Sequence, residues 1–301
     1  FLAQCPEEQP FFLQLSFHDP HRPFDHEAIP DRHDPTTLTL PPHYPDTAIA
    51  REDLARHYDE ITRFDRQFGE VRELLVRHDR TENTLIIFMG DNGAALLRGK
   101  GTLYEFGIRV PLILHWPGHI APGRTDRLVS GEDIAPTLLT VAGLPVPEVM
   151  TGRDFSSLWD ETKSAEDPRR YIFAQRGSHG TELPVDTASF DLSRVVVGRS
   201  HKLIYNAMWQ LPYIPIDFDQ EPIWQELVAL NREGRLDPDL ARIYFPDARP
   251  MFELYDLEQD PAEMQNLAGT VAVAEIETEL RNALAEWMIL ERDYVPLPVG
   301  L

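Results

Sequence analysis

The stretch formed by residues 84–116 limits the fold of this chain more than any other part of the sequence. Residues 85–89 are a continuous apolar run of strand length that ends at Gly90, a pattern typical of a strand buried on both faces. Asp91 and Asn92 follow at once, at the end of the predicted strand where open α/β sheets bind ligands. Their oxygen donors suit Ca²⁺ or Mg²⁺, whereas the plain alternative is a turn, because Asp-Asn-Gly is itself a turn signal.

Two further polar groups follow apolar segments. Lys100 stands between two glycines, so its backbone can come close to an anion. Residues 10–17 read as a second central strand, because apolar residues show little alternation there. A dense polar cluster follows directly, and its members with chemistry to offer a ligand are His18, Asp19, His21 and Arg22.

The order of elements predicts the fold class. Apolar residues at helical spacing predict a helix over residues 49–78, with Asp65 on its apolar face and therefore buried beside partners. A strand over residues 110–115 and a glycine-capped helix over residues 134–141 follow. This alternation predicts an α/β domain with a doubly wound, mainly parallel sheet over residues 1–160.

The pattern changes after residue 159, where a charged, apolar-poor segment is expected to be a linker. Short apolar segments then predict a small antiparallel sheet, and an amphipathic final helix is predicted over residues 273–290. Residues 161–301 are therefore expected to form a smaller α+β domain. The predicted strands of this domain are residues 171–174, 194–197, 202–205 and 252–255.

Charge and composition exclude several classes of protein. The net charge of −22 argues against a nucleic-acid partner, because phosphate binding requires clustered Lys and Arg. No apolar run approaches the ~20 residues of a membrane span. Cys5 is the single cysteine of the 301 residues, which excludes an internal disulfide and a thiolate metal cluster within this chain.

Six segments, spread over nearly the whole chain, resemble in sequence and order the sulfatases of the alkaline-phosphatase-like superfamily. Within that family, the His18–Arg22 element and the Gly-Ser-His-Gly-Thr-Glu segment at residues 177–182 are most similar to the heparan N-sulfatase (sulfamidase) branch. Lys100 departs from this branch, which tends to carry arginine there. The six segments are residues 12–24, 58–69, 83–93, 99–116, 133–143 and 253–267.

The resemblance implies a role for each candidate residue. Asp91 and Asn92 are implied to be ligands of a divalent cation, usually Ca²⁺, with Mg²⁺ or Mn²⁺ as alternatives. His21 is implied to protonate the leaving group and Lys100 to contact a sulfate oxygen. These roles suit sulfuryl transfer, which builds negative charge on oxygen. Substrate contacts are expected from His18, Arg22, His179 and Glu182.

The nucleophile of the family is missing from this sequence. Sulfatases use a formylglycine made from the cysteine of Cys-x-Pro-Ser-Arg, but Cys5 is followed by Pro-Glu-Glu. The resemblance implies that the chain corresponds to roughly the C-terminal two-thirds of a sulfatase. The formylglycine is therefore expected in an N-terminal part, and the 301 residues alone are not expected to turn over substrate.

Three hypotheses follow. The first is a metal-dependent sulfatase that hydrolyses a sulfate ester or sulfamate on a sulfated sugar, such as an N-sulfoglucosamine unit. The second keeps the fold and changes the reaction to that of a phosphodiesterase or a phosphonate monoester hydrolase. The third is a non-catalytic binding protein on a sulfatase scaffold. The expected partner is a sulfated carbohydrate, and the sequence is compatible with an oligomer.

Overall fold

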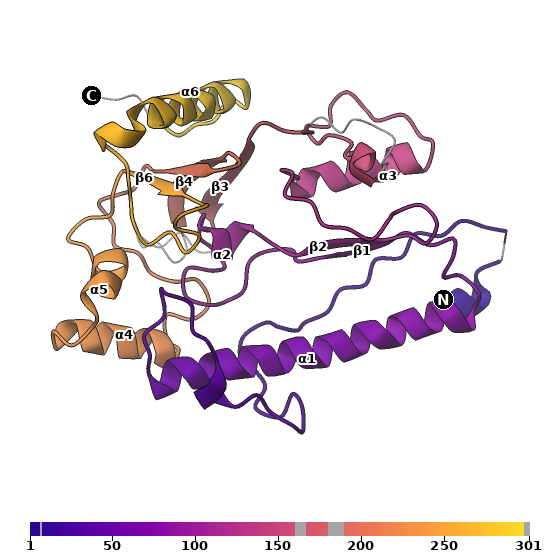
Figure 1. Ribbon diagram of the computed structural model, residues 1–301, viewed down its shortest axis with the longest axis horizontal. Coiled ribbons are helices and arrows are strands. Elements are labelled where there is room, and N and C mark those ends of the chain that lie inside the picture. Colours follow the sequence, from indigo (N-terminus) through magenta and orange to yellow (C-terminus); the bar gives the residue numbers. More distant parts are fainter. Residues whose placement is uncertain (7, 160–166, 180–189, 298–301) are drawn as a thin grey trace.

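The computed structural model describes residues 1–6, 8–159, 167–179 and 190–297. Figure 1 shows three parts: a long helix along one side, a two-stranded sheet in the middle, and a four-stranded sheet covered by the last helix. Within the described residues, every helix is too short or too polar to cross a bilayer. Short 3₁₀ turns lie at Leu2–Gln4, Pro35–Thr37, Gly131–Asp133, Ser156–Trp159 and Val271–Val273.

The long helix α1 (Ala48–Arg77) confirms the predicted helix. It begins where the side chain of Thr47 accepts a hydrogen bond from the backbone N–H of Ala50, the usual role of an N-cap threonine. The expected burial of Asp65 is wrong, because this side chain is exposed. The helix turns Asp59 and Glu60 inward instead, and residues 25–33 supply their partners.

The two-stranded sheet pairs β1 (Ile86–Met89) with β2 (Leu112–His115), and the short helix α2 (Glu105–Ile108) lies between them in sequence. The strands run antiparallel, with Ile86 opposite His115. Both strands and the following helix α3 (Ile134–Val141) lie where the sequence predicts them. The described part of residues 1–160 contributes this antiparallel pair and no parallel one.

The predicted strand over residues 10–17 is wrong. This segment forms no ladder with any described residue, and Phe12 is 77% exposed. An apolar sequence favours a strand, but a strand exists only where a neighbour accepts and donates its backbone hydrogen bonds. The segment nevertheless delivers His18 and His21 to the site described below.

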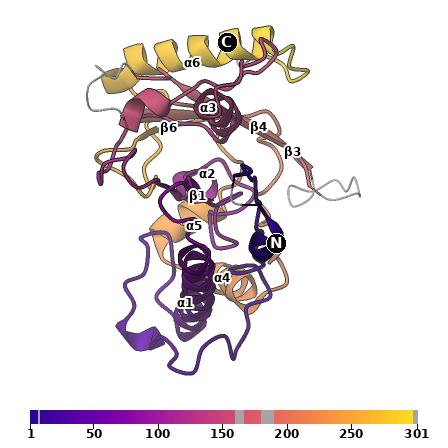
Figure 2. The same ribbon diagram turned by 90° about the vertical axis from the view of Figure 1, so that its right-hand side faces the viewer.

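The four-stranded sheet confirms the predicted antiparallel sheet and its helix. Its strands lie in the order of the sequence, and every neighbouring pair is antiparallel. Helix α6 (Ala274–Leu290) covers one face, where Leu284 packs against Val196 and Leu203 (Figure 2). The strands are β3 (Ile172–Ser178), β4 (Phe190–Val197), β5 (His201–Asn206) and β6 (Phe252–Asp256).

The sequence analysis missed two helices, α4 (Pro222–Arg232) and α5 (Pro238–Tyr244). They lie between β5 and β6 in the sequence and join the four-stranded sheet to the region of α1. Each carries a proline in its first turn, which is a common helix start. Leu227 of α4 shares one hydrophobic core with Leu54 of α1 and with Leu97. The domain boundary near residue 160 stays a prediction, since residues from both sides of it build this core.

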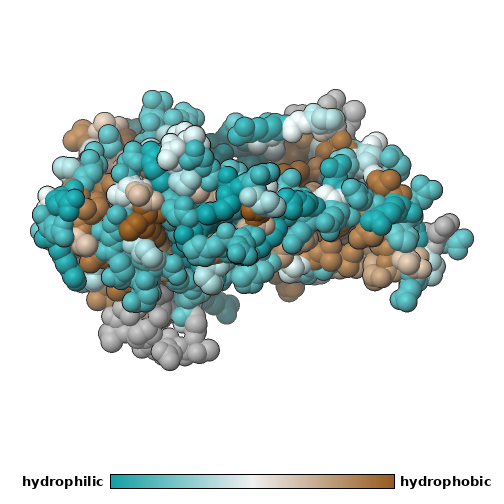
Figure 3. All heavy atoms as spheres, turned by 90° about the horizontal axis from the view of Figure 1, so that it is seen from below, coloured by the Kyte–Doolittle hydropathy of each residue, from teal (hydrophilic) through white to brown (hydrophobic). Residues whose placement is uncertain are grey.

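The surface agrees with the acidic composition. The face drawn in Figure 3 is largely hydrophilic, and hydrophobic side chains gather toward its right-hand end. The most exposed large hydrophobic residues include Phe12 at 77% and Val149 at 90%.

One buried ion network joins the four-stranded sheet to the segment after Lys100. Lys202 of β5 is fully buried, and its Nζ lies 2.7 Å from a carboxylate oxygen of Glu105 and 2.9 Å from one of Glu263. Glu263 also accepts a hydrogen bond from the backbone N–H of Glu105 at 2.6 Å. Burial raises the pKa of Glu263, and the charge of Lys202 opposes that rise.

Replacing Lys202 should destabilise the protein strongly. In Lys202→Met the buried carboxylate of Glu263 remains in the interior without its cation, which costs about 3–5 kcal/mol of unfolding free energy in comparable cases. Urea unfolding followed by circular dichroism measures this loss. The exposed pair of Arg235 with Glu233 provides the control, since Arg235→Met should change stability by at most about 1 kcal/mol. Equal effects of the two substitutions would contradict this account of the network.

Candidate active site

Helix α1 holds the segment that carries the two histidines. Asp19 accepts hydrogen bonds from the guanidinium of Arg63 at 2.6 and 2.7 Å. The backbone N–H of Asp25 donates to Glu60 at 2.7 Å. Both contacts fix residues 19–25 to one face of the helix, so the histidine between them has a defined position.

Arg22 fixes this segment to the Lys100 loop. Its side chain forms a two-point ion pair with Asp53 of α1, at 2.8 and 2.5 Å, and donates to the carbonyl of Ala95 at 2.5 Å. The guanidinium also stacks 4.3 Å from the ring centre of Phe24. Arg22 is 5% exposed, so its donors serve the fold, and its expected contact with substrate stays a prediction.

Glycines shape the loop that presents Lys100. A Cβ atom on Gly99 would lie 2.0 Å from the carbonyl oxygen of Ala94. Gly101 has φ +78°, and a Cβ atom there would lie 2.2 Å from Cδ1 of Ile216. Only glycine permits both approaches. Gly101 contacts Ile216, and Asp217, the residue after Ile216, therefore lies beside Lys100.

The structure brings five side chains together, here called the Lys100 cluster: His18, His21, Lys100, His179 and Asp217. Lys100 Nζ lies 3.1 Å from Nε2 of His21 and 2.5 Å from Oδ2 of Asp217. Nε2 of His179 lies 3.2 Å from Oδ1 of Asp217. The rings of His18 and His21 have centres 5.2 Å apart.

The hydrogen bonds of His21 define which nitrogen faces the cluster. Nδ1 lies 2.6 Å from the carbonyl oxygen of Arg22, which can only accept, so Nδ1 carries a proton and donates it. Nε2 is then free to accept from the ammonium of Lys100. The imidazole therefore presents Nε2, the atom that can exchange a proton, to the same point as Lys100.

Asp217 is the member of the cluster that the sequence analysis missed. It stands in a loop, where no strand or helix signal marks it, and its φ of +65° suits Asp or Asn. Partial burial raises the pKa of Asp217, but the hydrogen bonds and charges of Lys100 and His179 outweigh this, so the pKa lies below its ordinary value. At neutral pH the ionised carboxylate of Asp217 is therefore paired with the ammonium of Lys100.

Asp91 and Asn92 follow β1 after the single residue Gly90 and are exposed. Asp91 Oδ1 accepts from the backbone N–H of Asn92 at 2.9 Å, and the Asn92 amide nitrogen donates to the carbonyl of Gly93 at 2.8 Å. Both residues keep a side-chain oxygen that suits a hard cation. Among the described residues, no group of three or more His, Cys, Asp or Glu side chains could hold a metal. These two residues therefore fit part of a cation shell.

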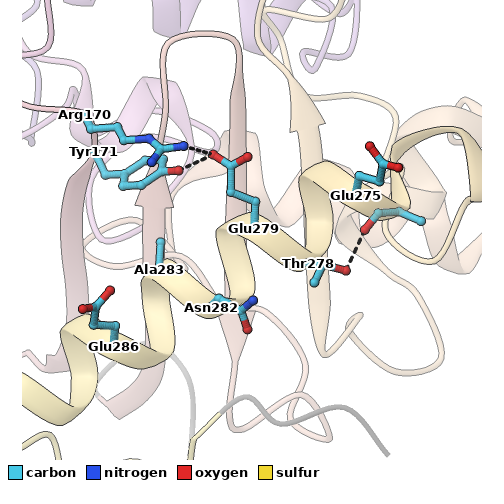
Figure 4. A pocket seen from close by; sticks show the side chains of 9 residues that line it. Arg170, Tyr171, Glu275, Thr278, Glu279, Asn282, Ala283 and Glu286 are labelled. Atoms are coloured by element: carbon cyan, nitrogen blue, oxygen red, sulfur yellow. Dashed lines mark hydrogen bonds and ion pairs between the residues drawn. The ribbon is translucent and has the colours of Figure 1, made fainter.

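The expected contact from Glu182 lies outside the described residues. A wide hollow of about 660 Å³ lies elsewhere, against α6 (Figure 4). Glu279 there accepts from Arg170 at 2.7 Å and from the hydroxyl of Tyr171. None of the residues that line this hollow belongs to the Lys100 cluster. The cluster, rather than this hollow, is the candidate active site.

Asp217 should contribute stability that depends on pH. Because its pKa is depressed in the folded state, the contribution is present above about pH 4, the unfolded value, and is lost as the pH falls through the folded value. Asp217→Asn removes the charge and keeps a residue that tolerates positive φ. We expect this variant to be less stable than the parent at pH 7 and equal to it in strong acid, by urea unfolding. Asp219→Asn, which breaks no ion pair among the described residues, should show no such trend.

Comparisons with known proteins show the family of this chain. The family model named Sulfatase matches residues 1–144. An ulvan-active sulfatase of Formosa agariphila is 34% identical over 87% of this chain and 42% of its own length. The human N-sulphoglucosamine sulphohydrolase is 31% identical over 99% of this chain and 64% of its own length. The chain thus spans about half the length of the relatives it matches.

Solved structures show the fold. A Bacteroides thetaiotaomicron protein, described in connection with the metabolism of multiple glycosaminoglycans, superposes with a TM-score of 0.67 at 20% identity. The match covers 96% of this chain and 56% of that one. A phosphonate monoester hydrolase of Agrobacterium radiobacter reaches a TM-score of 0.56 at 22% identity, over 81% of this chain and 43% of its own. The expected fold class, α/β with a smaller antiparallel region, is confirmed, and the chain belongs to the sulfatase family.

Proposed function

We propose that the protein to which these 301 residues belong is a sulfatase that releases sulfate from a sulfated sugar. The observation that carries the proposal is the meeting of Lys100 Nζ and His21 Nε2 at 3.1 Å, from two loops that are each fixed by buried contacts. A cation and a proton-exchanging nitrogen at one point suit a tetrahedral oxyanion whose leaving atom must be protonated.

In this proposal Lys100 and His21 act on different atoms of the substrate. Lys100 donates to a sulfate oxygen, where negative charge grows during sulfuryl transfer. His21, held by its Nδ1 hydrogen bond to Arg22, offers Nε2 to the leaving atom. For this role Nε2 must carry a proton, which it donates to the leaving atom as the sulfur–leaving atom bond breaks. We assign no nucleophile to the described residues, and a formylglycine in another part of the polypeptide remains our expectation.

The sulfate group can pair with Lys100 only after the carboxylate of Asp217 has moved away from the ammonium. In the structure the ammonium of Lys100 donates a hydrogen bond to the carboxylate of Asp217 at 2.5 Å. We propose that Asp217 then turns to the sugar together with His179, where a carboxylate suits the amine or hydroxyl groups of a glucosamine unit. His18 borders the same space beside His21. The 31% identity to the human N-sulphoglucosamine sulphohydrolase supports an N-sulfoglucosamine-like substrate.

We further propose that Asp91 and Asn92 hold part of a Ca²⁺ site, with Mg²⁺ or Mn²⁺ as alternatives. Their place at the end of β1 and their exposed side-chain oxygens support this proposal. When bound, such a cation would polarise a sulfate oxygen. The remaining ligands would come from outside the described residues, since Ca²⁺ takes about six to eight oxygens.

The proposed function is tested on the full polypeptide with N-sulfoglucosamine, by ion chromatography of released sulfate. Lys100→Met should lower kcat/KM by about 10²–10³-fold, as loss of one donor to a developing oxyanion does. Arg235→Met, on an exposed surface pair, should keep the parent value. Faster hydrolysis of a phosphonate monoester or a phosphodiester than of the sulfated sugar would favour the second reaction class instead. Absence of release from all three would leave a binding protein.

The metal proposal predicts saturable calcium binding that needs Asp91. Isothermal titration of the full polypeptide with Ca²⁺ should show binding that weakens by at least about tenfold in Asp91→Ala, because an anionic ligand is lost. Asp154→Ala should bind as the parent does, since among the described residues this exposed carboxylate accepts hydrogen bonds from Ser156 alone. Unchanged affinity in Asp91→Ala would contradict the assignment.

A further inference from the structure

A second cavity, of about 320 Å³, lies behind the loop that carries Lys100. Arg98, Thr102 and Tyr104 of that loop line it, together with residues of β3, β4, β5, β6 and α5. Among its lining residues there is no member of the Lys100 cluster. The cavity is therefore a separate site from the candidate active site, although Gly99 alone separates Arg98 from Lys100 in sequence.

Arg98 is the unusual group in this cavity, because its charge is buried and no described carboxylate forms an ion pair with it. The residue is 3% exposed, and its guanidinium donates to the carbonyl of Glu263 at 2.9 Å. It stacks 3.7 Å from the ring centre of Tyr104. No described acid forms an ion pair with it. A buried cation in this state is costly unless an anion compensates it.

The acids that line the cavity are already engaged. Asp191 forms a two-point ion pair with Arg249, at 2.8 Å for each oxygen. Glu253 accepts hydrogen bonds from Tyr104, from Tyr255 and from Asn206, at 2.8, 2.5 and 2.6 Å. Neither carboxylate is free to turn toward Arg98. Glu263 attracts Arg98 from outside the lining but is itself paired with Lys202, so no described carboxylate is free to pair with Arg98.

A second lining group also lacks a partner. The hydroxyl oxygen of Tyr213 is buried and makes no hydrogen bond to any described residue. Buried hydroxyl groups are nearly always paired, so this one indicates an acceptor or donor that the chain itself does not provide. Arg98 and Tyr213 both line this cavity, so each can offer a donor to one ligand there.

We propose that this cavity binds a small organic oxyanion, a carboxylate or sulfate carried on a body of about monosaccharide size. The planar donors of Arg98 match the two oxygens of such a group. The rings of Tyr104 and Tyr255 and the side chain of Ile204 line the space for the rest of the ligand. The volume lies at the lower end of the ~300–1,000 Å³ range of small-molecule sites.

Calorimetric titration tests the proposal, with glucuronate and glucosamine 6-sulfate as probes and glucose as the neutral control. At least one anionic sugar should bind saturably, and glucose should not. Arg98→Met should weaken that binding by about tenfold or more, because a charged hydrogen bond is lost. Lys100→Met should retain it, since Lys100 does not line the cavity. The tighter of the two probes identifies the preferred oxyanion.

Absence of saturable binding, or full affinity in Arg98→Met, would overturn the proposal. So would binding that is lost in Lys100→Met and kept in Arg98→Met, because the anion would then occupy the Lys100 cluster. If Arg98→Met does not fold, Tyr213→Phe takes its place. Removal of that hydroxyl should weaken binding about fivefold, and an unchanged affinity would overturn the proposal. Failure of the proposed sulfatase activity leaves these outcomes unaffected.

Discussion

The buried ion network of Lys202, Glu105 and Glu263 is the interaction on which the site most depends. It joins the central part of the four-stranded sheet to the chain just after the Lys100 loop, and Lys202 and Glu263 are both buried. Leu103 adds an apolar contact, since it packs with Val195 and Ile204 of the sheet. The sheet therefore serves as the platform on which the Lys100 loop is built.

The second half of the site depends on a different support. Helix α1 holds His21 through the ion pairs of Asp19 with Arg63 and of Arg22 with Asp53. Arg22 also joins this segment to the Lys100 loop, because it donates to the carbonyl of Ala95 before Lys100. The distance between Lys100 and His21 is thus set by two rigid elements and one buried guanidinium, rather than by the two side chains themselves.

Local sequence predicts the parts of this structure that depend on local periodicity. Helices α1, α3 and α6 and strands β1 to β6 lie where apolar spacing places them, and six segments spread over the chain led to the sulfatase family. The strand over residues 10–17 failed because pairing depends on a partner strand and not on composition.

The candidate site was predicted in part for the same reason. His21, Lys100 and His179 were expected and are brought together, whereas Asp217 was missed. Nothing in the neighbouring residues marks Asp217, because its role arises from a contact between Gly101 and Ile216 across more than a hundred residues. Arg98 is similar, since burial without a carboxylate partner is a property of the packed structure and not of its sequence.

The central claim is that the Lys100 cluster binds the sulfate group of a sugar substrate. A crystal structure of the protein with bound N-sulfoglucosamine tests it most directly. The account predicts the sulfate group between Lys100 Nζ and His21 Nε2, with Asp217 displaced from the ammonium toward the sugar. A sulfate group bound away from both residues, with the ion pair of Lys100 and Asp217 intact, would contradict it.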